Sequence, residues 1–426
     1  MQRTDYTAVG ETLYSAVLPN GLSIYVVPKP GYRRSFAVFA ANYGGADRRF
    51  TLGGRTLDTP AGVAHYLEHK MFDTEEGDAL MKMSATGADP NAFTSQAMTA
   101  YHFECTDAFA ENLRTLLSFV SVPWFTRESV DKERGIIAQE IRMYEDSPDD
   151  VVYMNLMKSL FRENPLRDSV AGTVESIAQI TPELLYDCHR TFYRPSNMAL
   201  CVVGNADPSM VEQIAGELLS PERSEIPGRD YGQSEGREPV RPLTKAYMPV
   251  SAPIFAIGEK LGPVPAPAES QLYRMTAGLA LRCLCGRSSP FYLKHYDGGL
   301  LNATFGCDVD FSAGQTVISF EGETAKEPEA VLSALREEIL RVHRQGFDPA
   351  LFDRQKKASL GGRIRGLTNF RGLAVGLAEG CFAGFQPLDA FGRIGSITCA
   401  DADRWVRENL DPERFAMSVV YPGEEA

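Results

Sequence analysis

The chain of 426 residues is poor in histidine, in closely paired cysteines and in long apolar runs. Its eight cysteines are scattered without a Cys-x-x-Cys pair, a pattern typical of reduced core residues rather than of a zinc knuckle. No run of about 20 apolar residues occurs, and the first residues lack the apolar stretch of a signal peptide. The sequence therefore predicts a cytoplasmic protein that does not insert into a membrane.

The chain also has an excess of negative charge, with a formal net charge of -13. A general basic surface for nucleic acid is therefore not expected, whereas basic peptides are mildly favoured. The composition, 44% hydrophobic and 23% charged, is that of an ordinary globular protein. The length predicts two or three domains rather than one small core.

Two of the six histidines, His65 and His69, lie four positions apart, with Glu68 just before the second. On a helix, positions i, i+3 and i+4 share one face. Two imidazoles so spaced can bind one Zn²⁺, and a nearby carboxylate can take a proton from water at the metal. The order His-x-x-Glu-His reverses the His-Glu-x-x-His order and is the inverzincin signature. Taken alone, the pentapeptide also fits a helix with two exposed or capping histidines.

A second informative stretch is residues 126–145, where apolar residues recur at helical spacing and Thr126 is a suitable N-cap. Glu133 and Glu140 are 140 − 133 = 7 positions apart, two turns, and so nearly in line. Glu140 lies beside several isoleucines, where an unpaired buried charge would be costly. A metal ion would supply the missing partner. The alternative is a solvated glutamate on a charged helix face.

The second half of the chain repeats the first in outline. The helical stretch at residues 113–145 has a counterpart at residues 331–365, and neither a His-x-x-Glu-His motif nor paired histidines occur there. Between the halves, residues 221–242 hold four prolines and many charges without periodicity, which predicts a linker. Strands are predicted on both sides of a turn at residues 19–21 and at residues 35–42, 100–105, 198–204, 253–260 and 415–421.

At this point the chain resembles the insulinase/pitrilysin family of zinc metallopeptidases, and the half-length bacterial members above all. The resemblance covers nearly the whole chain, and the matching blocks follow the family's order. The blocks are residues 18–22 (LPNGL), 62–72 (GVAHYLEHKMF), 87–94 (GADPNAFT), 132–141 (KERGIIAQEI) and 146–148 (DSP).

The resemblance implies a role for individual residues of this sequence. His65, His69 and Glu140 are expected to be zinc ligands, and Glu68 the general base that activates water. Glu133 is expected to orient a ligand. A Zn²⁺ held by two neutral imidazoles and one carboxylate keeps a fourth position open, as catalytic zinc requires. The resemblance also implies that Asn91 and Ala92 lie beside the cleft and pair with the substrate backbone.

One departure from the family concerns residues 291–302 (FYLKHYDGGLLN), where members carry an Arg and a Tyr that clamp the substrate. Here Lys294 and Asn302 stand at those positions, and a lysine cannot make the bidentate contact of an arginine. The expected enzyme is therefore a heterodimer in which a homologous metal-free subunit supplies Arg and Tyr. A homodimer that uses Lys294 and Asn302 is the other option.

The sequence thus predicts an α+β fold of two similar domains, each an antiparallel sheet with helices packed on one face. The expected boundaries are residues 1–224 for the metal-binding catalytic domain, 225–244 for the linker and 245–426 for a second homologous domain. The expected function is a zinc endopeptidase that hydrolyses short or unfolded peptides within a clamshell chamber. A non-catalytic scaffold subunit and a processing peptidase for one leader or modified peptide are the alternatives.

Overall fold

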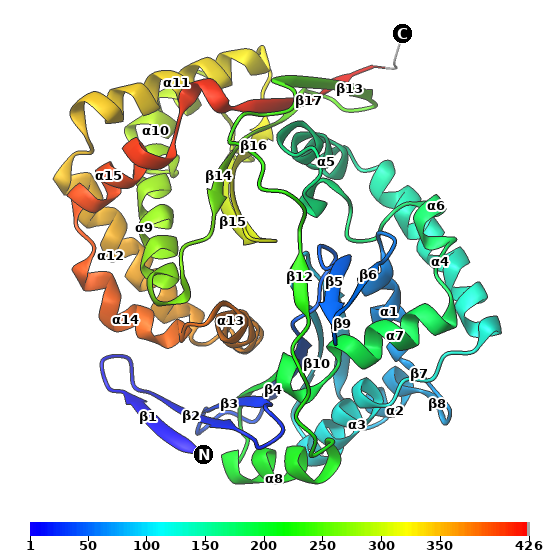
Figure 1. Ribbon diagram of the computed structural model, residues 1–426. Helices are drawn as coiled ribbons and strands as arrows, with labels where there is room; N and C mark the ends of the chain where they lie inside the picture. Colours follow the sequence, from blue (N-terminus) through cyan, green and yellow to red (C-terminus); the bar gives the residue numbers. More distant parts are fainter. Residues whose placement is uncertain (424–426) are drawn as a thin grey trace. The chain divides into compact units, whose positions relative to one another are not determined.

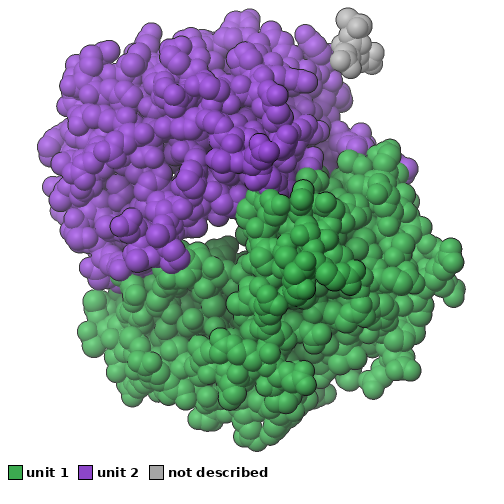
Figure 2. Space-filling model, viewed as in Figure 1, with its two compact units in different colours: residues 1–141, 169–231, 363–389 green, residues 142–168, 232–362, 390–426 purple. Residues whose placement is uncertain are grey.

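The computed structural model describes residues 1–423, and the chain forms two compact units, each with its own sheet and helices (Figures 1 and 2). Unit 1 consists of residues 1–141, 169–231 and 363–389. Unit 2 consists of residues 142–168 and 232–362 and of the chain from residue 390 onward. Both units are therefore assembled from more than one stretch of sequence. The division into two homologous domains, residues 1–224 and 245–426 with a linker between them, stays a prediction.

Unit 1 is built on a seven-stranded sheet of order β1-β2-β3-β11-β4-β10-β9, in which only β3 and β11 run parallel. The central strands β4 and β11 are buried along their whole length, which requires cover on both faces of the sheet. The strands are β1 Gln2–Tyr6, β2 Glu11–Val17, β3 Ser23–Pro28, β4 Ser35–Ala41, β9 Asp89–Thr94, β10 Thr99–Cys105 and β11 Met198–Gly204. The hairpin predicted at Asn20-Gly21 is confirmed, since β2 pairs antiparallel with β3 across it.

Unit 2 is built on a five-stranded sheet of order β13-β17-β14-β16-β15, in which only β13 and β17 run parallel. Its strands are β13 Leu243–Met248, β14 Ile254–Pro263, β15 Gly306–Ser312, β16 Gln315–Glu323 and β17 Ala416–Pro422. Set beside β3-β11-β4-β10-β9 of unit 1, the order and the directions of the strands are the same. This repetition confirms the predicted α+β fold with two similar domains.

The helices follow the same repeated plan between the strands. Helices α1 and α2 connect β4 to β9, as α9 and α10 connect β14 to β15, and longer helical runs precede β11 and β17. The first half contains α1 Val63–Met71, α2 Ala79–Ser84, α3 Phe109–Ser121, α4 Arg127–Glu145, α5 Pro148–Leu160, α6 Val174–Ile177, α7 Pro182–Phe192 and α8 Pro208–Leu218. The second contains α9 Pro267–Cys285, α10 Pro290–Asp297, α11 Pro328–Gln345, α12 Pro349–Gly366, α13 Phe370–Ala383, α14 Ala390–Arg393 and α15 Cys399–Asn409. Within residues 1–423, none of these helices has the length and apolar character to cross a membrane.

Two helices that the sequence reading did not identify, α5 and α13, each pack in the unit built mainly from the other half of the sequence. Helix α5 packs on β14 and β17 of unit 2, and α13 packs on β4 and β11 of unit 1. In unit 2, Phe255 and Ile257 of β14 enter the main core with α9, α11 and α15. Gly258, which points the other way, faces Leu156 of α5, so this helix covers the opposite face of the sheet. The main helical layer lies on one face, as predicted, and a single helix adds cover to the other.

The proline-rich segment at residues 221–242 is tied to the units by charged groups. Its short strand β12, Gly228–Asp230, pairs with β5, Arg49–Leu52, which in turn pairs with β6, Arg55–Asp58. Arg229 forms an ion pair with the buried carboxylate of Asp47 (Nε–Oδ1 2.9 Å). In unit 2 the carboxylate of Glu235 accepts three backbone N–H bonds from residues 162–164, which lower its pKa to about 2 although burial opposes this shift.

Candidate metal centre

Helix α1, which carries the His-x-x-Glu-His motif, begins at a glycine that no other residue can replace without strain. Gly62 has φ 96°, and a Cβ atom there would lie 2.6 Å from the carbonyl oxygen of Ala171. The hydroxyl of Ser176 donates to the carbonyl of Ala61 (2.8 Å). The segment around residues 171–176 therefore fixes where α1 begins and in which direction its histidine side chains point.

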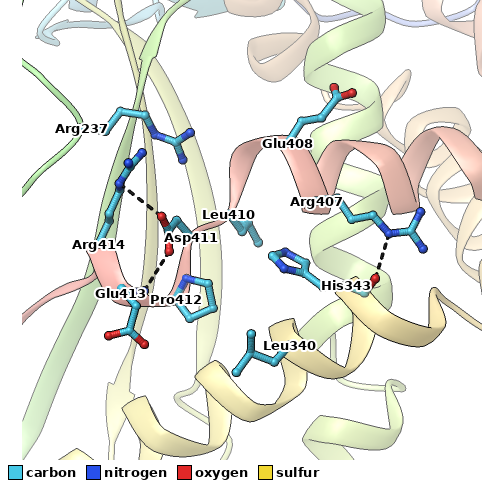
Figure 3. Close-up of a pocket in the computed structure, with 10 residues that line it drawn as sticks. All are labelled: Arg237, Leu340, His343, Arg407, Glu408, Leu410, Asp411, Pro412, Glu413 and Arg414. Carbon is cyan, nitrogen blue, oxygen red and sulfur yellow. Dashed lines mark hydrogen bonds and ion pairs between the residues drawn. The ribbon is translucent and has the colours of Figure 1, made fainter.

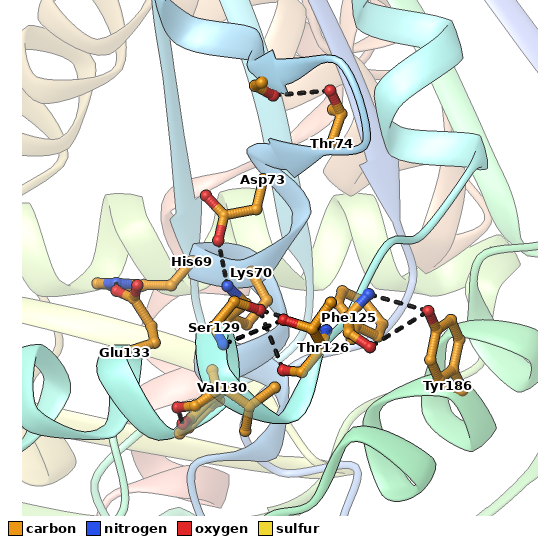
Figure 4. Close-up of polar contacts among 12 residues, drawn as sticks. His69, Lys70, Asp73, Thr74, Phe125, Thr126, Ser129, Val130, Glu133 and Tyr186 are labelled. Atoms are coloured by element: carbon orange, nitrogen blue, oxygen red, sulfur yellow. Dashed lines mark hydrogen bonds and ion pairs between the residues drawn. The ribbon is translucent and has the colours of Figure 1, made fainter.

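Helices α1 and α4 are joined through buried contacts of Tyr66. This side chain is fully buried, and its hydroxyl donates to the carbonyl of Val130 in the first turn of α4. The predicted N-cap of α4 is confirmed, because the Oγ1 of Thr126 accepts the backbone N–H of Ser129 (3.1 Å) and the Ser129 hydroxyl oxygen accepts that of Thr126 (3.3 Å). Figure 4 shows this cap and, beside it, the approach of α4 to α1.

The two helices bring His65, His69 and Glu140 together, and one ligand atom from each lies within 4.8 Å of the others. The Nε2 atom of His65 lies 3.5 Å from Oε1 of Glu140, and the Nε2 atom of His69 lies 3.4 Å from Oε2. Within residues 1–423 this is the one group of three or more His, Cys, Asp or Glu side chains that could hold a metal ion. The sequence predicted the three residues, and the fold places them in one cluster.

The distances in this cluster fit a common Zn²⁺ ion. Ligand atoms about 2.0–2.2 Å from one tetrahedral ion lie about 3.3–3.6 Å apart, and both N–O separations fall in this range. The Nδ1 atom of His65 is buried and has no hydrogen-bond partner in the described part of the chain. Its Nε2 is thus the ring atom that faces the cluster. Two imidazoles and one carboxylate are the donor set of a zinc site with one position open.

Glu133 contacts the far side of His69, as the Nδ1 atom of the ring lies 2.9 Å from its Oε1 (Figure 4). Burial lowers the pKa of His69, but the hydrogen bonds to Glu133 and Glu140 outweigh it and raise the pKa to about 9. In the metal-free protein these carboxylates therefore favour the protonated form of His69, and that proton must leave before the ring can bind a metal. A carboxylate on Nδ1 is the partner that fixes the orientation of a metal-binding imidazole and strengthens it as a ligand.

Glu68, the expected general base, is buried beside the cluster, with 8% of the residue exposed. Its Oε2 accepts a hydrogen bond of 2.6 Å from the hydroxyl of Thr94. Burial raises the pKa of this carboxyl, and the Thr94 hydroxyl and both histidines oppose the increase. The charges of His65, His69 and Glu140 all act on this carboxyl group, so Glu68 lies near the three candidate ligands.

Asn91 and Ala92 lie in β9, the edge strand of the sheet in unit 1. In the register with β10, Ala92 lies opposite Tyr101 and Thr94 opposite Thr99, so Ala92 shares the face of Thr94 and of α1. Asn91 points to the other face, and its Oδ1 accepts the N–H of Ala92 (2.8 Å). The outer edge of β9 pairs with no other strand among the described residues, which makes it a place where an extended peptide can add.

Lys294 and Asn302, the expected replacements for the clamp, belong to unit 2. Lys294 is exposed on α10, one position after the exposed Leu293. The Oδ1 of Asn302 accepts both the backbone N–H and the hydroxyl of Thr304 (2.8 and 2.6 Å), so its side chain caps the local turn. No contact of either residue identifies a substrate.

A hollow of about 320 Å³ on unit 2 is unrelated to these residues (Figure 3). Two of its arginines are already paired, because Arg237 binds Glu259 (Nη2–Oε1 2.6 Å) and Arg414 binds Asp411 (Nε–Oδ2 3.3 Å). Residues lining it are Arg237, Leu340, His343, Arg407, Glu408, Leu410, Asp411, Pro412, Glu413 and Arg414. It contains no second metal cluster, and the candidate site stays at α1 and α4.

Comparison with known proteins identifies the family of the chain. Residues 53–174 match the family model described as "Insulinase (Peptidase family M16)", and residues 179–359 match the one described as "Peptidase M16 inactive domain". The "uncharacterized zinc protease YmfH" of Bacillus subtilis is 34% identical over 98% of this chain and 98% of its own. The "uncharacterized zinc protease SCO5738" of Streptomyces coelicolor is 26% identical over 96% of this chain and 90% of its own.

Solved structures show the same fold over almost the whole chain. A putative M16-like peptidase from Alicyclobacillus acidocaldarius superposes with a TM-score of 0.93 at 32% identity, covering 97% of this chain and 99% of the other. A protease from Helicobacter pylori superposes with a TM-score of 0.83 at 18% identity, covering 96% and 99%. The chain therefore belongs to the M16 (insulinase) peptidase family, and its relatives in Bacillus and Streptomyces carry the name of zinc proteases.

Proposed function

We propose that this protein is a zinc-dependent endopeptidase that hydrolyses short or unfolded peptides. The observation that carries the proposal is the cluster of His65, His69 and Glu140, with the buried carboxylate of Glu68 beside it. The names of the zinc-protease relatives point the same way. When bound, zinc would act as a Lewis acid that polarises the scissile carbonyl and eases the deprotonation of water.

The chain's own residues would divide the remaining work. Glu133 keeps the His69 ring turned toward the cluster through its contact with Nδ1. Glu68 would accept the proton of the attacking water and return it to the leaving amine. The open edge of β9, at Asn91 and Ala92, would hold the peptide backbone as an added strand and so place the scissile bond near the base.

The first test measures zinc per chain in protein purified without added metal. About one zinc ion per chain is expected, and none in the His65→Ala, His69→Ala double variant. Glu68→Gln is expected to keep the zinc and lose cleavage of a fluorogenic peptide library. Glu111→Gln, on the exposed surface of α3, is the matched control and should cleave at the wild-type rate.

The absence of zinc from wild-type protein, even after soaking, would contradict the proposal and favour a non-catalytic scaffold subunit. Cleavage of a single leader or modified peptide, with the general library untouched, would instead favour a dedicated processing peptidase. A folded protein substrate of stable structure should resist cleavage, because a backbone must be extended to pair with a strand edge.

We also propose a homologous metal-free subunit as partner, because Lys294 and Asn302 replace the Arg and Tyr expected for the substrate clamp. The Asn302 side chain is already engaged by Thr304, which supports this proposal over a homodimer. Low activity alone and a large gain on mixing with such a subunit are expected. Full activity of the purified chain alone would contradict the need for a heterodimer. A cytoplasmic location stays a prediction.

A further inference from the structure

The contact between Glu68 and Thr94 joins two parts of the proposed site that lie in different elements. Glu68 belongs to α1, and Thr94 is the last residue of the edge strand β9. The hydroxyl of Thr94 donates to Oε2 of Glu68 at 2.6 Å, a length typical of a strong hydrogen bond to a carboxylate. Within residues 1–423 the other oxygen, Oε1, accepts no hydrogen bond from the protein. The carboxylate is thus held by one oxygen only.

The proton of Thr94 is committed to Glu68 because the nearest hydroxyl is engaged elsewhere. Thr99, directly opposite in β10, is fully buried, and its hydroxyl donates to the carbonyl of Tyr43 (2.9 Å). The two threonine Oγ1 atoms lie 3.3 Å apart, yet each hydroxyl has a single proton and a better acceptor. The neighbouring strand therefore leaves Thr94 one stable orientation, which points its proton at the glutamate.

We infer that Thr94 is a positioning residue, which holds one oxygen of Glu68 and directs the other toward the attacking water. This inference rests on the proposed function and adds to it a coupling between substrate and base. Ala92, two residues before Thr94, lies on the same strand and the same face. A peptide that pairs with β9 would stiffen this strand and, through Thr94, the orientation of the base.

The test replaces Thr94 by Val, which keeps the shape of the side chain and removes the hydroxyl, and by Ser, which keeps the hydroxyl. For Thr94→Val we expect kcat to fall about tenfold to a hundredfold with KM nearly unchanged, and for Thr94→Ser a loss of less than about threefold. The matched control is Thr51→Val. Thr51 is an exposed strand residue whose hydroxyl bonds the hydroxyl of Thr56 (2.9 Å) and none of the proposed site residues, and its loss should leave kcat unchanged.

Two further measurements do not depend on turnover. Zinc content and the affinity for a peptide with a reduced, non-cleavable bond, measured by calorimetry, should be the same in Thr94→Val as in wild type. An unchanged kcat in Thr94→Val, a change in KM alone, or the loss of zinc would each overturn the inference. If Glu68→Gln also leaves cleavage intact, the proposed function itself fails. If Glu68→Gln abolishes cleavage while Thr94→Val does not affect it, only the role of Thr94 fails.

Discussion

Replacement of His102 by phenylalanine is expected to make unit 1 more resistant to acid. His102 lies in β10, is 4% exposed, and has an Nε2 atom without a partner in the described part of the chain. The rings of Phe36 and Phe93 lie nearby, with centroids 5.0 and 6.3 Å away. Burial, aided by the positive charge of Arg371, lowers the pKa of His102 from 6.5 to about 4. The folded protein therefore keeps this ring neutral.

The size of the effect follows from the two pKa values. Because the pKa of His102 is lower in the folded state, the unfolded chain takes up the proton first, and stability is lost as the pH falls from about 6.5 to about 4. At about pH 5, protonation of His102 in the unfolded chain multiplies the equilibrium constant of unfolding by about 30, which lowers the free energy of unfolding by about 2 kcal/mol. Near pH 7.5 the same term almost vanishes. His102→Phe removes it and also removes an unpaired buried nitrogen, whose burial costs about 1–3 kcal/mol.

The assay is urea unfolding of wild type and His102→Phe near pH 7.5 and near pH 5, with a chelator present throughout. The chelator removes differences in metal loading, and all other titrating groups are common to both proteins. We expect the wild type to lose about 2 kcal/mol more than the variant between the two pH values. Equal losses would show that His102 is not held neutral by burial, and the reasoning would be refuted.

Three further changes test the packing around the site and between the elements. Leu156→Ala in α5, where the side chain faces Gly258, should lower the free energy of unfolding of unit 2 by about 2–5 kcal/mol in urea titrations, and a loss below about 1 kcal/mol would mean that α5 is not firmly packed. Gly62→Ala, with its Cβ against the carbonyl of Ala171, should lower both the melting temperature and the zinc affinity, and an unchanged melting curve would contradict the strained start of α1. Glu133→Gln should weaken zinc binding about tenfold to a hundredfold in a competition titration without unfolding the protein, whereas wild-type affinity would exclude a role in orienting the ligand.

Much of the candidate site follows from local spacing. His65, Glu68 and His69 share a helix face because they lie three and four positions apart, and the helix is where the pattern predicts it. Glu133 and Glu140 are in line because two turns of α4 separate them. The hairpin at Asn20-Gly21 and the cap at Thr126 are equally local, since each depends on residues a few positions apart.

The contact of Thr94 with Glu68 has no signal of this kind. The strand pattern of β9 predicts on which face Thr94 lies, but not that α1 would pack there with Glu68 at hydrogen-bond distance. Only the packing of α1 on the edge of the sheet decides that pair. The same holds for His102. The alternating pattern of β10 predicts its strand position but not its unpaired buried nitrogen or the effect of the Arg371 charge on it.

The amino-acid sequence by itself thus determined which residues can bind and activate, in which order they occur and that the chain has two similar halves. Tertiary structure decided which of them meet. The contact of Tyr66 with α4 brings Glu140 close to the two histidines of α1. In the sequence Glu140 lies 140 − 69 = 71 positions after His69. Tertiary structure also placed α5 and α13 each on the sheet that the other half of the sequence forms, and no periodicity in the sequence reveals this. Spacing fixes contacts within one helix or hairpin, whereas contacts between elements depend on the complementary surfaces of the whole core.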